Sequence, residues 1–446
     1  MQSETPEVEK SSLGRYAAAL VFVAVGAAAF AVVFREAINV VFTGIYRAKD
    51  VLSAFERLPW FLRLLIPALG GACTGAVSLL TSRLRGGQGV GDVMEAVVLG
   101  RTRISLGLAA SKALGSWFAI VSGGSIGREG PIIQFGGGLG GVAGRMFRLR
   151  LEQTRALVAA GTAAGFAAAY NTPLAAVLFV VEIVTGVVAL ETILPAIVAT
   201  PIATALTRLV IGGGPIYGQR SFATNSELDL LGYAALGLAA GFAGPAFMEM
   251  LDRGGALFAR LRWPKPLCAA LGGLVVGAIA IELPQVTGNG YEAINLILSG
   301  EVGAVLVVVL LVAKAVATTA SVSSGSPGGV FTPTLFLGAA LGGAVGHVVS
   351  LFGSPGSPAT VGAYALVGMA ALISSTTHAP LLGAVMVFEL SQDYAIVLPL
   401  LIATATATLV SRRIRPTSIY MEELRRRGLG WEITLEGRKM RPPLPP

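Results

Sequence analysis

Residues 124–144 read GSIGREGPIIQFGGGLGGVAG, and residues 325–346 read GSPGGVFTPTLFLGAALGGAVG. Each stretch opens with Gly-rich sequence that disfavours a helix and then continues as an apolar, helix-compatible run. Equivalent positions lie 202 residues apart in three pairs: Pro131 with Pro333, Gly136 with Gly338, and Gly144 with Gly346. The two stretches therefore predict two related halves, each containing a helix that begins abruptly.

Further blocks repeat in the same order along the chain: residues 173–182 with 380–389, and residues 87–92 with 288–293. Three matched blocks in register indicate an internal duplication, which we place at about 60–211 and 231–411. Non-helical backbone at membrane depth is tolerated only where it is buried in protein or lines a watery cavity. Broken helices in both halves therefore indicate a substrate site near the middle of a membrane.

The composition is that of a membrane protein. Of the 446 residues, 54% are hydrophobic and only 13% are charged, and the mean hydropathy is +0.73. A soluble chain carries about 25% charged residues, and the 58 glycines suit membrane helices whose backbones approach closely. We therefore expect an all-α, polytopic membrane protein with many helices that are short, tilted or broken at mid-membrane.

The net charge of +8 is carried mainly by short loops and the C-terminal region. Basic clusters occur at Arg145, Arg148, Arg150 and Arg155, at Arg412, Arg413 and Arg415, and at Arg425, Arg426 and Arg427. Short basic loops mark the cytoplasmic side, so we expect the terminal segments 1–15 and 431–446 to be cytoplasmic. The membrane domain is then 16–430, with the lipid bilayer as its partner and no nucleic acid.

The sequence offers no catalytic or metal-binding constellation. His347 and His378 are the only histidines, and neither lies near other metal ligands at a suitable spacing. Cys73 and Cys268 stand alone, and no phosphate-binding loop of the G-x-x-x-x-G-K-[ST] type occurs. We therefore expect a protein that is not an enzyme and that uses no metal or cofactor.

The two abrupt helix starts suit a small anion. A helix N-terminus presents unpaired N–H groups and about half a positive charge, and dipoles bind weakly enough for ions to leave. Glu129 stands at one of these starts, although a lone carboxylate in a membrane core costs about 2.5–3.5 kcal/mol. Ionised, it would occupy the place an anion needs, and protonated it would be free to leave, so Glu129 is a candidate gate. The alternative is a salt bridge with Arg128, but adjacent helical residues face each other poorly.

These motifs resemble the CLC family of chloride channels and chloride/proton antiporters, in its prokaryotic form without C-terminal CBS modules. The resemblance covers about 16–430 and rests on GREGP at 127–131, GGVFTP at 328–333, the blocks 170–182 and 378–394, and Ser418-Ile-Tyr420. It implies two inverted repeats, a homodimer with one pore per subunit, voltage-gated conduction and a place in the plasma or inner membrane. It also implies chloride as the bound substrate.

The resemblance assigns roles to single residues. Glu129 resembles the external gating glutamate of the family. Val330 and Phe331 match the residues whose backbone amides hold the central anion, and Tyr420 matches the tyrosine whose hydroxyl completes that site. Arg128 and Gly130, within the GREGP motif, are further candidate anion-binding residues.

The chain departs from the family pattern in its early motif, which usually reads G-S-G-I-P. Here the aligned residues are Gly87-Gln88-Gly89-Val90-Gly91. Gln88 thus replaces a serine whose hydroxyl donates to the anion, and Gly91 replaces the proline. The Gln88 amide can donate or accept, so Gln88 is kept as a candidate anion ligand and the selectivity for chloride is open.

A second departure concerns protons. Antiporters of the family usually carry a glutamate directly after the position matched by Glu182, where this chain has Ile183. An apolar residue cannot relay protons, which favours channel-like or weakly proton-coupled conduction. Glu182 itself, together with Glu129, remains a candidate for a proton path.

The leading hypothesis is therefore a pathway for chloride-type monovalent anions gated by Glu129. Coupled chloride/proton antiport is the first alternative, and transport of another anion, suggested by Gln88, is the second. A transporter of organic or multivalent anions is disfavoured, because Arg128 is the only cationic residue in the matched pore motifs. A non-transporting scaffold would have no use for a buried Glu129.

Overall fold

The computed structural model describes residues 6–81, 89–214, 216–218, 229–351, 358–434 and 437–441. Almost all of this part of the chain is helical, and it contains nine helices long and apolar enough to cross a membrane. The predicted all-α, polytopic class is thereby confirmed. One short antiparallel hairpin follows the last helix and consists of β1 (Gly430–Thr434) and β2 (Gly437–Arg441).

The helices of the first half are α1 (Pro6–Gly44), α2 (Val51–Arg57), α3 (Trp60–Leu80), α4 (Val90–Leu99), α5 (Leu106–Val121), α6 (Glu129–Met146), α7 (Leu151–Tyr170), α8 (Pro173–Phe179), the π-helix η1 (Val180–Thr185) and α9 (Leu190–Ile211). Those of the second half are α10 (Asp229–Leu261), α11 (Lys265–Glu282), η2 (Pro284–Val286), α12 (Tyr291–Leu298), α13 (Ala304–Ser323), α14 (Phe331–Ser350), α15 (Pro358–Thr377), α16 (Pro380–Ser391), η3 (Tyr394–Ile396) and α17 (Val397–Ile414). A short helix, α18 (Ile419–Arg426), follows.

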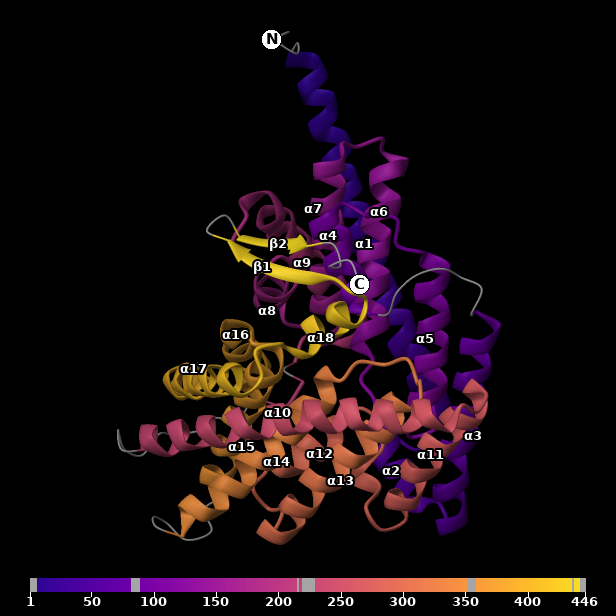
Figure 1. The fold of residues 1–446 in the computed structure, drawn as a ribbon, viewed down its shortest axis with the longest axis vertical. Helices are drawn as coiled ribbons and strands as arrows, with labels where there is room; N and C mark the ends of the chain where they lie inside the picture. Colours follow the sequence, from indigo (N-terminus) through magenta and orange to yellow (C-terminus); the bar gives the residue numbers. More distant parts are fainter. Residues whose placement is uncertain are drawn as a thin grey trace.

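The two halves repeat each other helix by helix. α3 to α9 correspond in order to α11 to α17. In Figure 1 the indigo-to-magenta half and the orange-to-yellow half lie against each other, and α3 packs beside α11. The loops before α6 and α14 meet in an antiparallel bridge between Gly127 and Gly329, as expected of halves related by a two-fold axis. The helix-by-helix correspondence confirms the predicted duplication.

Equivalent helix crossings are equally close in the two halves. An ideal Cβ on Gly136 of α6 would lie 2.2 Å from the carbonyl oxygen of Gly161 of α7, and one on Gly161 would lie 2.1 Å from that of Gly136. The corresponding pair, Gly338 of α14 and Gly368 of α15, gives 2.4 and 2.3 Å. Only glycine permits such approach of two backbones, and these contacts fix α6 and α14 in the bundle.

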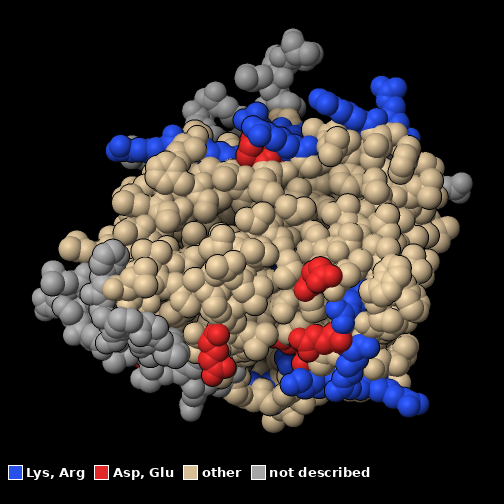
Figure 2. Space-filling model, turned by 90° about the horizontal axis from the view of Figure 1, so that it is seen from below, with Lys and Arg blue, Asp and Glu red and all other residues tan. Residues whose placement is uncertain are grey.

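The surface carries an apolar band. Figure 2 shows Lys, Arg, Asp and Glu gathered mainly along the upper and lower rims, with other residues between them. Large apolar side chains are exposed on the long helices, including Leu209 at 83%, Val305 at 79% and Leu409 at 68%. Apolar surface of this extent requires lipid around it. The chain is thus a multi-pass membrane protein.

The helix crossing of α6 and α7 yields a stability prediction. Gly136→Ala places a methyl group against the Gly161 carbonyl, so we expect a loss of about 1–3 kcal/mol, as for overpacked cores. Thermal unfolding of the purified protein measures this as a lower midpoint. Gly255→Ala on α10 is the matched control, because an ideal Cβ there has no heavy atom within 4 Å. Equal midpoints for the two variants would contradict the close crossing.

Candidate functional site

Two helix starts meet inside the molecule. α6 begins at Glu129 and α14 at Phe331, and neither N-cap residue, Arg128 or Val330, caps its own helix with its side chain. The preceding loops are joined by two hydrogen bonds, in which the Gly127 N–H donates to the Gly329 carbonyl at 2.7 Å and the Gly329 N–H donates to the Gly127 carbonyl at 2.9 Å. The free N–H groups at the two starts are therefore brought close together, as the sequence predicted.

The Glu129 carboxylate crosses from α6 to the N-terminus of α14. Its Oε1 accepts hydrogen bonds from the backbone N–H groups of Phe331 at 2.9 Å and Thr332 at 3.2 Å, and its Oε2 accepts one from the Thr332 hydroxyl at 3.0 Å. Only 2% of the residue is exposed. Three donors and the positive end of α14 offset the cost of burying this charge. A carboxylate held in this way marks a place where an anion can bind.

Two glycines make room for this carboxylate. An ideal Cβ on Gly127 would lie 2.2 Å from both oxygens of Glu129, and one on Gly329 would lie 2.1 Å from Oε1. Any larger residue at either position would displace the carboxylate or the loop. The absence of side chains at Gly127 and Gly329 thus leaves room for the Glu129 carboxylate beside the backbone of both loops.

The neighbouring motif residues take separate positions. The Arg128 guanidinium lies over the Tyr291 ring, 5.0 Å from its centroid, and within the described residues no ion pair joins it to Glu129. The alternative of a salt bridge is therefore wrong.

Two further motif residues lie at the helix starts. Gly130 lies against the Gly329 backbone, with 3.4 Å between an ideal Cβ on Gly130 and the Gly329 nitrogen. The Val330 carbonyl accepts the first helical hydrogen bond of α14 from the Thr334 N–H.

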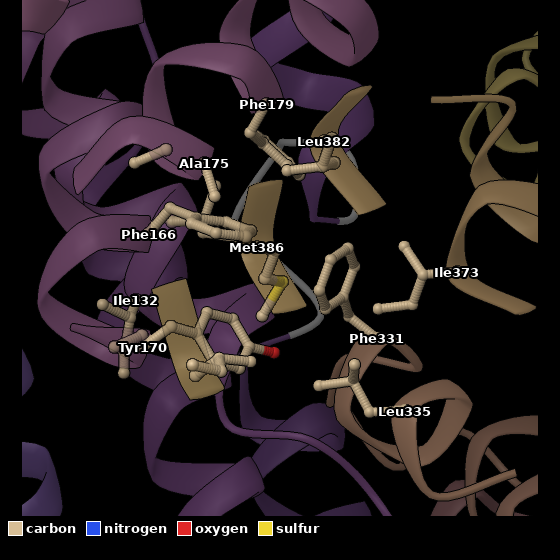
Figure 3. Packing of buried hydrophobic residues seen from close by; sticks show 14 of the residues in the cluster. Ile132, Phe166, Tyr170, Ala175, Phe179, Phe331, Leu335, Ile373, Leu382 and Met386 are labelled. Carbon is tan, nitrogen blue, oxygen red and sulfur yellow. The ribbon is translucent and has the colours of Figure 1, made fainter. Parts of the chain in front are cut away.

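An aromatic wall extends from the carboxylate site. The Phe331 ring meets Phe166 edge-on at 5.5 Å, Phe166 packs on Phe179 at 4.8 Å, and Phe179 meets Tyr420 edge-on at 6.2 Å. Figure 3 shows Phe166, Tyr170 and Phe179 facing residues of the second half across this cluster. Tyr420 is thus connected to Phe331 through two intervening rings, and its part in anion binding stays a prediction, whereas the Phe331 backbone N–H contacts Glu129 directly.

Ion pairs anchor the helix that carries Tyr420 to both halves. Arg427, just after α18, pairs with Asp92 of α4 at 2.7 Å and with Glu423 at 2.5 Å. Arg426 pairs with Asp252 of α10. Asp92 also accepts a hydrogen bond from the Gln134 amide of α6 at 2.6 Å. α18 is thus linked to the helix that starts at the site.

The early motif lies partly outside the described residues. Gln88 is among the residues that the structure does not describe, so its position relative to the carboxylate stays a prediction. Gly91 is described, and an ideal Cβ there would lie 2.9 Å from Oε1 of Glu423 and 3.2 Å from a guanidinium nitrogen of Arg427. The ends of the Glu423 and Arg427 side chains thus lie directly over the position where the family motif has proline.

Glu182 has a clear structural contact. Its carboxylate accepts hydrogen bonds from the backbone N–H groups of Leu381 at 3.3 Å and Leu382 at 2.7 Å, and so caps α16. Glu389 of the second half caps α8 in the same way, through the N–H groups of Leu174 and Ala175. Each half thus caps a helix of the other half.

A part for Glu182 in proton transfer remains a prediction. The next residue, Ile183, is buried in η1.

The sequence pattern does not single out two hydroxyl groups that lie at this site. Thr332 touches the Glu129 carboxylate, and the Tyr170 hydroxyl lies 2.9 Å from the Thr332 hydroxyl. Both residues are buried, at 0% and 1% exposure. Thr332 follows Phe331 directly within GGVFTP, so the motif contained it, but a threonine inside an apolar helix start is usually a local helix contact. Tyr170 ends α7, 162 positions away, and only the fold brings the two together.

A cavity of about 470 Å³ is lined in part by Arg128, the residue before Glu129. Its lining includes Arg35, Arg128, Asn289, Tyr291 and Glu292. Among the described residues, no group of three or more His, Cys, Asp or Glu side chains could hold a metal ion.

The fold and the site together define the class of protein. The chain has inverted membrane repeats, and a carboxylate is held where two helix starts meet. This is a membrane transport protein with a buried anion-type site.

Comparison with known proteins identifies the family. Residues 69–412 match the family described as voltage gated chloride channel, so the chain belongs to the CLC family. It is 34% identical over 376 residues to the voltage-gated ClC-type chloride channel ClcB of Salmonella typhimurium, covering 84% of this chain and 89% of the relative. It is 39% identical over 400 residues to a ClcB-like protein of Ralstonia nicotianae, covering 89% and 93%.

Solved structures share the fold. A slow cyanobacterial Cl⁻/H⁺ antiporter matches with a TM-score of 0.82 at 24% identity, over 95% of this chain and 99% of that one. A CLC-type fluoride/proton antiporter matches with a TM-score of 0.73 at 24% identity, over 94% and 98%. Membership of this family makes anion transport the general function of the chain.

The anchor of α18 yields a second stability prediction. Arg427→Ala leaves Asp92 and Glu423 without the cation between them, and we expect a loss of about 1–3 kcal/mol. Thermal unfolding at low and high salt measures it, and the loss should shrink at high salt. Arg425→Ala is the matched control, because its side chain is 71% exposed and meets Glu422 only at 3.8 Å. A loss as large for Arg425→Ala would contradict the anchoring role.

Proposed function

We propose that this protein carries chloride-type monovalent anions across the cell membrane, through a pore in each subunit that the Glu129 side chain opens and closes. The observation that carries the proposal is the Glu129 carboxylate itself, which takes the N–H groups of Phe331 and Thr332 that an anion would use. The general function of the family and the two helix starts support it. The cargo is a bound substrate, and no cofactor or enzymatic step is involved.

Gating follows from the charge of one side chain. The ionised Glu129 carboxylate is an acceptor only, and it is held by three donors at the positive end of α14. Protonation removes the charge and turns one oxygen into a donor, so the attraction to the helix dipole is lost. The side chain then leaves and an anion takes its place. Acid therefore favours the open state.

The site favours small monovalent anions. Its donors are backbone N–H groups and one hydroxyl, and within the described residues no Lys or Arg forms an ion pair with Glu129. A multivalent or organic anion normally needs such cations. Val330, Gly130 and Gln88 remain candidate ligands from the two motifs, and Gln88 keeps open a preference for an anion other than chloride.

Conduction is proposed to be channel-like or weakly proton-coupled. Ile183, at the place of the glutamate that antiporters of the family carry, is 3% exposed and apolar. Coupled chloride/proton antiport is the alternative, since protons reach Glu129 in either case. We also propose a homodimer in the cell membrane with both termini in the cytoplasm, on the strength of the family and the basic loops.

Removing the charge of the gate should open the pore. Glu129→Gln keeps the size of the side chain but abolishes its ionised form, so we expect anion flux in proteoliposomes above that of the unchanged protein at neutral pH. The rise in flux on acidification should disappear. Glu152→Gln, which removes a carboxylate from the first turn of α7 at the surface, is the control and should keep the pH response. A preserved pH response in Glu129→Gln would refute the gating role.

Simultaneous chloride and proton flux in proteoliposomes tests the coupling. A chloride gradient should drive little uphill proton movement in the unchanged protein, because Ile183 cannot carry a proton. Ile183→Glu should increase the number of protons moved per anion, and Ile183→Gln, equally polar but not titratable in this range, should not. Strong uphill proton transport by the unchanged protein would establish the antiporter alternative.

A further inference from the structure

The Glu129 carboxylate shows which groups can hold an anion at this place. One of its oxygens is bound by two backbone N–H groups, and the other by the Thr332 hydroxyl at 3.0 Å. Thr332 is completely buried. An anion that replaced the carboxylate would meet the same three donors, of which the Thr332 hydroxyl is the one side-chain donor on α14.

The proton of each hydroxyl can be assigned. A carboxylate is an acceptor only, so the Thr332 hydroxyl must donate its single proton to Glu129. The Thr332 oxygen is then left as an acceptor, and Tyr170, 2.9 Å away, must donate to it. The chain of donors runs from Tyr170 through Thr332 to the negative charge. Hydrogen bonds aligned in this way polarise and strengthen one another.

We propose that Thr332 is an anion-binding residue of this pore, with Tyr170 as the positioning residue that orients its hydroxyl. This rests on the proposed function. The ligand class is a small monovalent anion such as chloride, bound in alternation with Glu129.

The experiment measures chloride binding calorimetrically in the full-length protein carrying Glu129→Ala, in which the site is free of the carboxylate. Adding Thr332→Val, which has the same shape without the hydroxyl, should weaken chloride binding about tenfold or more. Thr332→Ser should restore it. Thr334→Val is the matched control, because the Thr334 hydroxyl, two residues along α14, donates to the Val330 carbonyl at 2.8 Å. It should leave chloride affinity unchanged.

The role of Tyr170 is tested in the same background. Tyr170→Phe should weaken chloride binding about threefold when Thr332 is present. It should add nothing when Thr332 is already Val, because Tyr170 acts through Thr332. An additive effect of the two substitutions would overturn the positioning role of Tyr170.

The outcomes separate this inference from the proposed function. Chloride affinity that is the same with Thr332→Val as without it, in protein that binds chloride, would overturn the inference and leave gating by Glu129 intact. Loss of binding that Thr332→Ser does not restore would also overturn it, since the hydroxyl would not be the cause. Absence of any chloride binding in Glu129→Ala would instead count against the proposed anion site as a whole.

Discussion

The structure depends on two reciprocal hydrogen bonds between Gly127 and Gly329. They join the loops before α6 and α14, so that two helix starts from opposite halves face one buried place. Neither half could build this place alone, because each helix start needs the other loop beside it. The duplication is therefore not incidental to the site. An inverted repeat brings equivalent loops together at its axis, where a pairing of loop with loop satisfies both backbones at once.

The same pairing explains why the loops are rich in glycine. The Glu129 carboxylate lies within 2.2 Å of where a Cβ would stand on Gly127, and within 2.1 Å of one on Gly329. Side chains at these positions would keep charged groups away from the backbone. Their absence lets N–H groups, rather than cations, neutralise the charge. Arg128, the nearest cation in the motif, packs on Tyr291 instead. In the proposed function this keeps binding weak enough for release.

The sequence predicted the parts that depend on local pattern. The two repeats, the abrupt helix starts and the position of Glu129 at one of them all follow from spacing and from the cost of a buried carboxylate. Contacts between distant residues were not predictable, because one sequence contains no information on which side chains meet. Tyr170 with Thr332 and Arg427 with Asp92 are of this kind. Glu182 illustrates the limit, since its capping of α16 depends on how the halves face each other.

Gly91 shows that a departure from a family motif can coincide with a contact between distant parts of the chain. The residue replaces the proline of the motif that also contains Gln88, and sequence alone suggests a change in the pore. In the fold, the ends of the Glu423 and Arg427 side chains lie 2.9 and 3.2 Å from where a Cβ on Gly91 would stand, so a larger residue there would require these side chains to shift. Arg427 also pairs with Asp92. Gly91 thus contacts residues that lie more than three hundred positions later in the chain. The glycine therefore favours the close approach of these two side chains to α4, and so the packing of α18, the helix that carries Tyr420, against it.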